Sequence, residues 1–325
     1  MRKLIFLGLA FCLAPHGSVA HAGMKKDLAD CPNPKSAASA TACTRILASG
    51  RLPKEQHYIA YYNRAWAHRL AGRNDQALAD YGRARALRPS FPKTLLSRGS
   101  LHRDMGRLER ARKDFDSYIA ISPKDWQGYL YRARTLRDLG RRSDALDDAE
   151  RAIERAPAQT QPKILRALLV AELGDNAGGL RLIDEVLAKA TDDIVARYVK
   201  AVVLHRSGQP LEALKEVEQV LQRDARFTAA STLRGRIQEE RGKIGEARSA
   251  YADALNNPLK NFDAVPAQAT ARARLASLGA VGSGDARLAR ATPARGVEPA
   301  PGRTVVACRR YVPAAATTIV VACDR

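Results

Sequence analysis

The chain has 325 residues, of which 54 are lysine or arginine and 34 are aspartate or glutamate, so its formal net charge is +20. This basic balance favours polyanionic or acidic partners but selects no single one. The sequence contains no G-x-S-x-G, H-E-x-x-H or G-x-x-x-x-G-K motif and no G-x-G-x-x-G after a strand, which argues against hydrolases, zinc proteases and nucleotide-dependent enzymes. We therefore predict a protein that is not an enzyme and has no cofactor and no metal site.

The N-terminus has the pattern of a secretory leader. Two basic residues precede an apolar run over residues 4–14, and an Ala-x-Ala cleavage site ends at Ala22. The run is too short to span a bilayer, and bulky Phe11 disfavours a lipoprotein signal ending at Cys12. We expect residues 1–22 to be a signal peptide, whose removal lowers the net charge to +18. The mature chain would be periplasmic or secreted and would have no transmembrane segment.

Four cysteines follow the leader as two close pairs, Cys31 with Cys43 and Cys308 with Cys323. An exported compartment favours disulfides over free thiols. Three connectivities are open, but local pairing closes short loops, and each such bond contributes about 3 kcal/mol in the chain-entropy model. A zinc site would require all four thiols to meet across the region between them. The sequence therefore predicts two local disulfides.

Residues 23–57 are interpreted as an N-terminal cap. Residues 23–34 read as extended, and a helical stretch from Lys35 to Ser49 ends at Gly50. The predicted disulfide would join these two parts. Such a cap is needed because the end of a stack of repeated helices exposes an apolar face.

Residues 58–261 repeat with a period of 34. A glycine returns six times at that spacing: Gly72, Gly106, Gly140, Gly174, Gly208 and Gly242. Glycine adopts a left-handed backbone without steric cost, so each one predicts a turn between two short helices. Seven residues before and five residues after each glycine, the residue is always glycine or alanine. These two columns of small residues would let the helices approach each other closely.

This pattern resembles the tetratricopeptide repeat, a helix-turn-helix unit of 34 residues. The resemblance covers residues 58–261 and implies an all-α, right-handed α-solenoid of about six repeats. The fourth unit, 160–193, departs most from the pattern because Gly179 falls inside a helix. Members of this family bind protein segments on their concave surface, so the resemblance also implies a scaffold that binds proteins or peptides.

One stripe on the first helix of each unit corresponds to the concave surface of the family. In this sequence the predicted peptide groove consists of Tyr62, Trp66, Arg69, Leu96, Arg103, Leu130, Arg134, Arg137 and Tyr198. The apolar members would supply contact area and the arginines would set polarity. Two interpretations of Arg69, Arg103 and Arg137 stay open: they pair with neighbouring acids, or they hold an acidic segment. For Trp66, internal packing and ligand contact are likewise both open.

A second column of charges is predicted to be structural. A basic residue stands eight positions before every glycine, and an acid stands eight positions after four of them. The bases are Arg64, Arg98, Arg132, Arg166, Lys200 and Arg234, and the acids are Asp80, Asp114, Asp148 and Glu216. We expect ion pairs between the two helices of a unit. His68 and His102 occupy equivalent positions, where we expect packing against the partner helix, with a shared metal as the alternative.

Three segments follow the repeats. Residues 262–279 are predicted to form a solvent-facing capping helix that shields the last repeat. Residues 280–303 read as a flexible linker because they are rich in Ala, Gly, Pro and Arg and have no apolar period. Residues 304–325 are predicted to form a β-hairpin, in which a turn between Ala315 and Ala316 places Cys308 opposite Cys323.

The sequence thus predicts a non-catalytic scaffold of the bacterial cell envelope that binds a protein or peptide partner, acidic in the arginine-ladder interpretation. Two alternatives stay open. A binder of nucleic acid or acidic wall polymer would lose affinity steeply with salt, although the scarcity of aromatic residues in the basic linker argues against base stacking. A regulatory subunit of an envelope enzyme would use the hairpin for docking. The sequence indicates no oligomeric state.

Overall fold

The computed structural model describes residues 24–33, 36, 38–257, 263–288, 307–312 and 317–322. The expected signal peptide and residues 289–303 of the expected linker lie outside these residues. Two compact units are distinguished, Met1–Ala276 and Ser277–Arg325, and each is treated by itself. Within the described residues, no helix combines the length and the apolar character that crossing a membrane requires.

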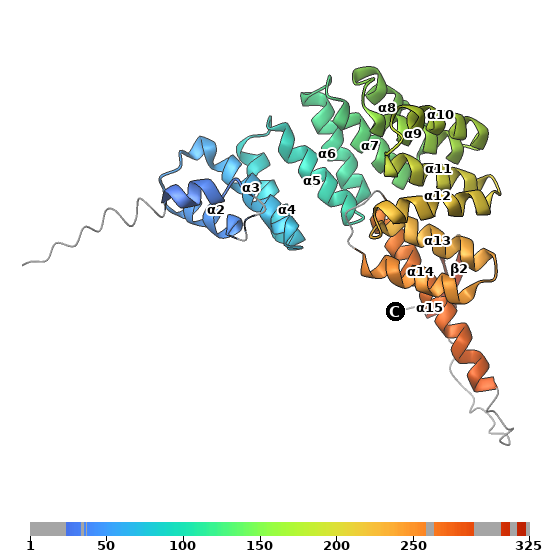
Figure 1. Cartoon of the computed structure of the whole chain (residues 1–325). Coiled ribbons are helices and arrows are strands. Elements are labelled where there is room, and N and C mark those ends of the chain that lie inside the picture. The colour runs from blue at the N-terminus through green and yellow to red at the C-terminus, as the bar shows by residue number, and fades with distance from the viewer. Residues whose placement is uncertain are drawn as a thin grey trace, which may run out of the picture. The chain divides into compact units, whose positions relative to one another are not determined.

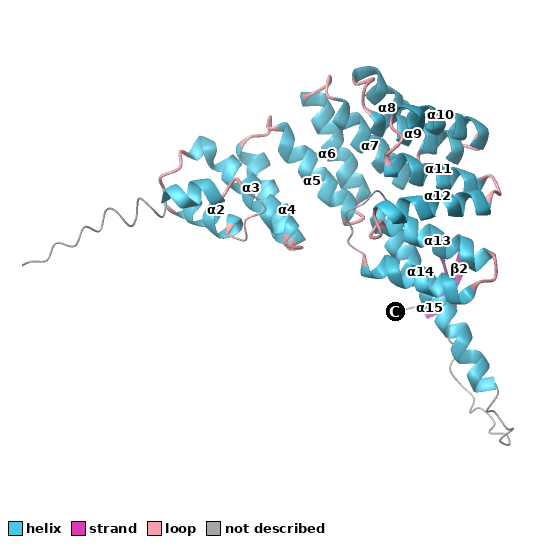
Figure 2. Cartoon of the chain, viewed as in Figure 1, coloured by secondary structure: helices cyan, strands magenta, loops and turns pink. Residues whose placement is uncertain are grey.

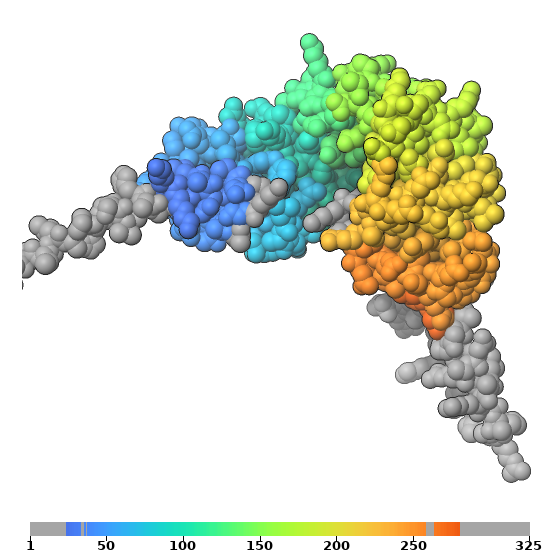
Figure 3. All heavy atoms as spheres, in the orientation of Figure 1, coloured from blue at the N-terminus to red at the C-terminus, as the bar shows by residue number. Residues whose placement is uncertain are grey.

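The first unit consists mainly of helices packed side by side in consecutive pairs (Figures 1 and 2). The six pairs are α3 (His57–Leu70) with α4 (Asn74–Leu87), α5 (Pro92–Asp104) with α6 (Leu108–Ile121), α7 (Trp126–Asp138) with α8 (Arg142–Arg155), α9 (Thr160–Glu172) with α10 (Asn176–Lys189), α11 (Ile194–Arg206) with α12 (Pro210–Arg223), and α13 (Thr228–Glu240) with α14 (Ile244–Asn256). The predicted all-helical repeat architecture is confirmed over this region. Side chains fill the spaces between the ribbons from α5 to α14 (Figure 3).

Each predicted turn glycine adopts a left-handed backbone, with φ between 71° and 112°. In the first repeat the Arg73 amide donates to the His68 carbonyl at 2.8 Å, and the Gly72 amide donates to the Arg69 carbonyl at 3.0 Å. These bonds satisfy carbonyls that the end of the helix leaves without partners. A side chain at the glycine would be strained in this conformation.

The columns of small residues lie where the two helices of a pair meet. A Cβ atom added at Gly99 would lie 2.8 Å from Cε1 of Phe115, and one added at Gly235 would lie 2.6 Å from Cε1 of Tyr251. Phe115 and Tyr251 are themselves fully buried. The bulky residue nine positions after the turn glycine therefore occupies the space left by the small residue on the paired helix.

The predicted ion pairs between paired helices are present. Three of them are bidentate, with both carboxylate oxygens engaged at 2.9 Å or less: Arg64 with Asp80, Arg98 with Asp114, and Arg132 with Asp148. All three carboxylates are buried. In the fourth repeat Leu182 stands where the acid would be, and Arg166 lies 3.4 Å from Glu150 of the preceding repeat instead.

The two equivalent histidines pack against their partner helices. His102 is buried, and Nδ1 of His68 accepts a hydrogen bond from Arg73 Nε at 3.0 Å. Burial lowers the pKa of both imidazoles below the ordinary value of 6.5. For His68 the neighbouring Arg73 adds to this effect, and Asp114 opposes it for His102.

These histidines predict a loss of stability in mild acid. Below pH 6.5 the unfolded chain takes up a proton that the buried imidazoles resist, so the free energy of unfolding should fall as the pH is lowered through that value. Urea denaturation at about pH 7.5 and about pH 5.5 measures the difference while most carboxylates stay ionised. Replacing both histidines by glutamine should reduce this pH dependence, and an undiminished dependence would contradict the assignment.

The N-terminal cap differs from its prediction in one part. Cys31 and Cys43 are bonded to each other, and helix α2 (Ser39–Ala48) lies within the predicted helical stretch. However, residues 24–30 are helical rather than extended. Their helix is held on α2 because Asp27 accepts hydrogen bonds from the Arg45 guanidinium and Met24 packs on the core around the disulfide.

The C-terminal capping helix also departs from its prediction. Helix α15 runs over Ala264–Leu288, so residues 280–288 are helical although a linker was expected there. Its start is not solvent-facing, because Ala264 and Ala271 are buried and Thr232 of α13 donates to the Ala267 carbonyl at 3.2 Å. The Ala-rich sequence favours helix even without an apolar period.

In the second unit, strand β1 (Ala307–Val312) pairs antiparallel with β2 (Thr317–Ala322). The predicted register is wrong, since Cys308 lies opposite Val321 rather than Cys323. The pairing begins at Val312 and Thr317, so the centre of the turn lies one residue earlier than predicted. Cys323 lies outside the described residues, and the second predicted disulfide gains no support.

Candidate binding surface

The first repeat carries an aromatic residue that is exposed on the predicted groove stripe. Trp66 of α3 is 39% exposed, and its ring meets the ring of Tyr62 edge-on at a centroid distance of 6.0 Å. The Tyr62 hydroxyl lies 3.2 Å from Oγ of Ser97 on α5, and its ring also contacts Tyr81 and Phe91. Trp66 is therefore held from one side by a fixed ring while much of its surface faces solvent.

The arginine column links each repeat to the next. Arg69 donates to Asp104 at 2.6 Å, Arg103 to Asp138 at 2.7 Å, and Arg137 lies 2.8 Å from Glu172. Each pair joins the end of one first helix to the end of the following first helix. This arrangement matches the interpretation in which the arginines pair with neighbouring acids, although the acid belongs to the next repeat. Together with Tyr62, Trp66 and half-buried Leu96, Arg69 and Arg103 form what we call the Trp66 surface.

Further along the stripe the predicted groove residues are covered. Leu130 and Tyr198 are buried, and Arg137 has 17% of its side chain exposed. Arg137 reaches a second acid besides Glu172: its Nη1 donates to both carboxylate oxygens of Asp263, at 3.0 and 2.9 Å. Asp263 directly precedes α15 and is 126 residues away in the sequence. The C-terminal helix therefore begins on the predicted groove stripe.

The side chains near Asp263 have pKa values that are shifted by burial and by neighbouring charges. Burial by itself would lower the pKa of Arg137, but Asp263 and Glu172 together raise it above its ordinary value. Burial lowers the pKa of Arg134, and the nearby charge of Arg103 adds to that effect. Burial raises the pKa of Tyr198, and the charge of Asp263 raises it further. The charge of Asp263 thus influences side chains on both α7 and α11.

The charged residues of the repeats near Asp263 are Arg103, Arg134, Arg137, Asp138 and Glu172. We call these five residues the Arg137 site. Sequence reasoning selected its arginines but missed Glu172 and Asp263. Glu172 had a signal, since it lies 35 residues after Arg137, just as Asp104 follows Arg69 and Asp138 follows Arg103. Asp263 lies outside the repeats, so no periodicity indicated it.

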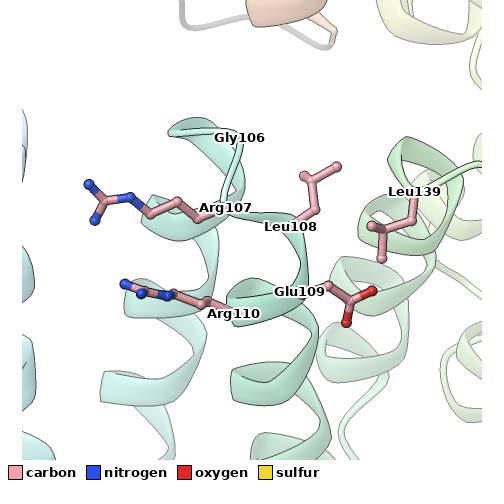
Figure 4. Close-up of a pocket in the computed structure, with 6 residues that line it drawn as sticks. All are labelled: Gly106, Arg107, Leu108, Glu109, Arg110 and Leu139. Atoms are coloured by element: carbon pink, nitrogen blue, oxygen red, sulfur yellow. The ribbon is translucent and has the colours of Figure 1, made fainter. Parts of the chain in front are cut away.

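A hollow lies beside the turn of the second repeat (Figure 4). Its walls are Gly106, Arg107, Leu108, Glu109, Arg110 and Leu139. Arg107 and Arg110 extend to one side of this turn, whereas Leu108, Glu109 and Leu139 lie on the other (Figure 4). None of these six residues is a serine, cysteine or histidine.

Comparison with solved structures finds the same fold. A tetratricopeptide repeat protein from Parabacteroides merdae is 16% identical with a TM-score of 0.68, and the match covers 79% of this chain and all of that one. A protein of the same repeat class from Thermus thermophilus is 18% identical with a TM-score of 0.50, over 58% of this chain and 99% of that one. The type IV pilus biogenesis factor PilW is 16% identical with a TM-score of 0.51, over 64% and 97%.

At the level of sequence, the family model described as tetratricopeptide repeat matches residues 62–126 and 198–266. No curated protein matches the sequence significantly. Both matched stretches fall on helix pairs with a left-handed glycine at the turn, and the six pairs keep the period of 34 residues throughout. These two stretches therefore contain tetratricopeptide repeats, and the helix pairs between them have the same fold.

Proposed function

We propose that the protein is a non-catalytic scaffold of the bacterial cell envelope that binds a segment of a partner protein on the Trp66 surface. The observation that carries this proposal is the exposure of Trp66 beside the Tyr62 ring, which also contacts Tyr81 and Phe91. Aromatic residues dominate the binding energy of protein interfaces when they are pre-oriented and partly exposed before binding. The partner segment would lay an apolar side chain on Trp66 and Leu96.

The ion pairs of the Trp66 surface would orient the partner. Asp104 and Arg69 have 42% and 31% of their side chains exposed, so both retain groups that can bond to a partner backbone. Since each arginine already has an acid, the surface is close to neutral and need not select an acidic segment. Placement in the envelope is supported by the leader-like N-terminus and by the bond between Cys31 and Cys43, which suits an oxidising compartment.

The proposal is tested by photocrosslinking from the position of Trp66. Benzoylphenylalanine at position 66 should crosslink to a defined partner in the native envelope, and unlabelled wild-type protein should compete. Leu211 of α12 is the matched control, because it is also a large apolar side chain and is 54% exposed. Crosslinks of equal yield and identity from positions 66 and 211 would contradict a specific surface at Trp66.

The polyanion alternative keeps one supporting feature, which is the net charge of the chain. The two functions differ in their dependence on salt. Affinity for a polyanion should fall by several powers of ten between about 50 and 200 mM salt, whereas the affinity of the Trp66 surface for a protein segment should change by less than about tenfold. Binding of the crosslinked partner at these two salt concentrations therefore decides between them.

A further inference from the structure

The Asp263 side chain is held by Arg137 in the way that a binding site holds a ligand. The Asp263 side chain is 11% exposed, and its two oxygens accept hydrogen bonds from one guanidinium nitrogen of α7. It comes from outside the repeats. Helix α15 could cover the last repeat without this contact, because Ala267 packs on the core cluster of α11 and α13 and Gln268 donates to carbonyls at the end of α14. The carboxylate therefore fills a position that capping alone does not require.

The charges around Asp263 indicate which chemical group the Arg137 site binds. Without it, the Arg137 site has three guanidinium groups, those of Arg103, Arg134 and Arg137. These face two carboxylates, those of Asp138 and Glu172, and Arg142 lies a further 3.4 Å from Glu172. Asp263 adds one further carboxylate, which offsets part of this excess of positive charge in a largely buried place. A carboxylate of any chain that reaches the position would meet the same hydrogen-bond donors.

The residues after Asp263 show how the rest of such a ligand would lie. Ala264 is 2% exposed, Ala271 is fully buried, and Ala267 packs on the core cluster. These residues stand one, four and eight positions after the acid, which places them on one face of a helix. The most buried residues on the face in contact with the repeats are therefore alanines. A helix carrying larger residues there would be held further from the repeats.

The backbone at Asp263 is held in an unfavourable conformation. Its φ is 54°, and it is the one residue other than glycine with a positive φ among the described residues. Aspartate tolerates this region better than most residues, but it still loses energy relative to helix or strand. Docking of the Asp263 carboxylate is thus opposed by backbone strain in this chain. A separate peptide can bind with a relaxed backbone and avoids this strain.

We propose that the Arg137 site is a second binding site, for a partner helix that begins with Asp or Glu and carries small residues one, four and eight positions later. In the isolated protein the start of α15 occupies this site, so a partner binds by displacing Asp263. While Asp263 occupies the site, a partner cannot bind there. The apparent affinity for the partner is therefore the intrinsic affinity multiplied by the fraction of molecules in which the site is free. This site shares Arg103 with the Trp66 surface, but it does not include Trp66 and does not depend on the function proposed for that surface.

The test uses the full chain and a labelled synthetic peptide of residues 263–276 with its N-terminus acetylated. Fluorescence anisotropy measures its affinity for wild type and for Asp263→Asn. The variant should bind the peptide about tenfold more tightly, because the charged hydrogen bonds of the internal ligand are lost. The same peptide with asparagine in place of its aspartate should bind the variant about tenfold more weakly.

Three controls make the result decisive. Asp253→Asn removes an exposed acid that pairs with Arg234 at 2.7 Å, and it should leave the peptide affinity unchanged. Arg137→Gln combined with Asp263→Asn should abolish the gain, and Arg137→Lys serves if the glutamine variant does not fold. Trp66→Ala should have no effect, which separates this site from the Trp66 surface. Equal affinity of wild type and Asp263→Asn, or a gain that persists without Arg137, would overturn the proposal.

Discussion

Asp114→Ala is expected to lower the free energy of unfolding by about 3 kcal/mol, since it leaves a half-buried guanidinium without its carboxylate. Asp114 is 3% exposed and accepts hydrogen bonds from both Nε and Nη2 of Arg98. The arginine side chain is itself largely covered, so water cannot fully replace the lost partner. Chemical denaturation followed by circular dichroism measures the change.

Glu109→Ala is the matched control for this prediction. Glu109 lies on the same helix α6 and also pairs with an arginine, at 2.9 Å from Nε of Arg112, but it is largely exposed. Its removal should change the free energy of unfolding by less than about 0.5 kcal/mol, because solvent screens an exposed pair. If the two variants lose the same stability, the column of ion pairs between paired helices does not hold the repeats together.

The second large effect is expected at the close contact between α5 and α6. Gly99→Ala should lower the free energy of unfolding by about 1–3 kcal/mol, because the new methyl group has no room beside Phe115. The distance of 2.8 Å from a Cβ at position 99 to the Phe115 ring requires the ring or a helix to shift. Phe115 is fully buried, so a shift of its ring would disturb the atoms packed around it.

Two further variants test whether steric crowding is the cause. Gly82→Ala lies inside α4 with no atom within 4 Å of the added Cβ, so it should raise stability by about 0.5–1 kcal/mol through better helix propensity. Combining Gly99→Ala with Phe115→Leu should give a coupling of at least about 0.5 kcal/mol in the favourable direction. Purely additive effects would show that the two residues do not compete for the same space.

The repeat architecture was predictable because its determinants recur in the sequence. Each turn glycine, small residue and helix-to-helix ion pair is specified several times, so a chance match at one position does not mislead. Gly106 and Asp114 could be assigned roles from their columns alone, and the structure gives them those roles. Even the exception in the fourth repeat, where Leu182 replaces the acid, could be read from the alignment of the units.

Features that occur once were not predictable in the same way. The contact of Asp263 with Arg137 joins a residue outside the repeats to one deep within them, and no local pattern encodes a contact over 126 residues. The helix over residues 280–288 was missed because alanine propensity acts without an apolar stripe. The strand register was misjudged because moving the turn by one residue keeps every side chain on its face of the sheet.

The long-range contact of Arg137 also affects the order in which the chain can mature. In a repeat protein each unit contacts only its neighbours, so folding can begin at any unit and spread along the array. Here the third repeat emerges 126 residues ahead of Asp263, the acid that completes its charge balance. The middle repeats therefore stay incompletely neutralised until the C-terminal helix arrives.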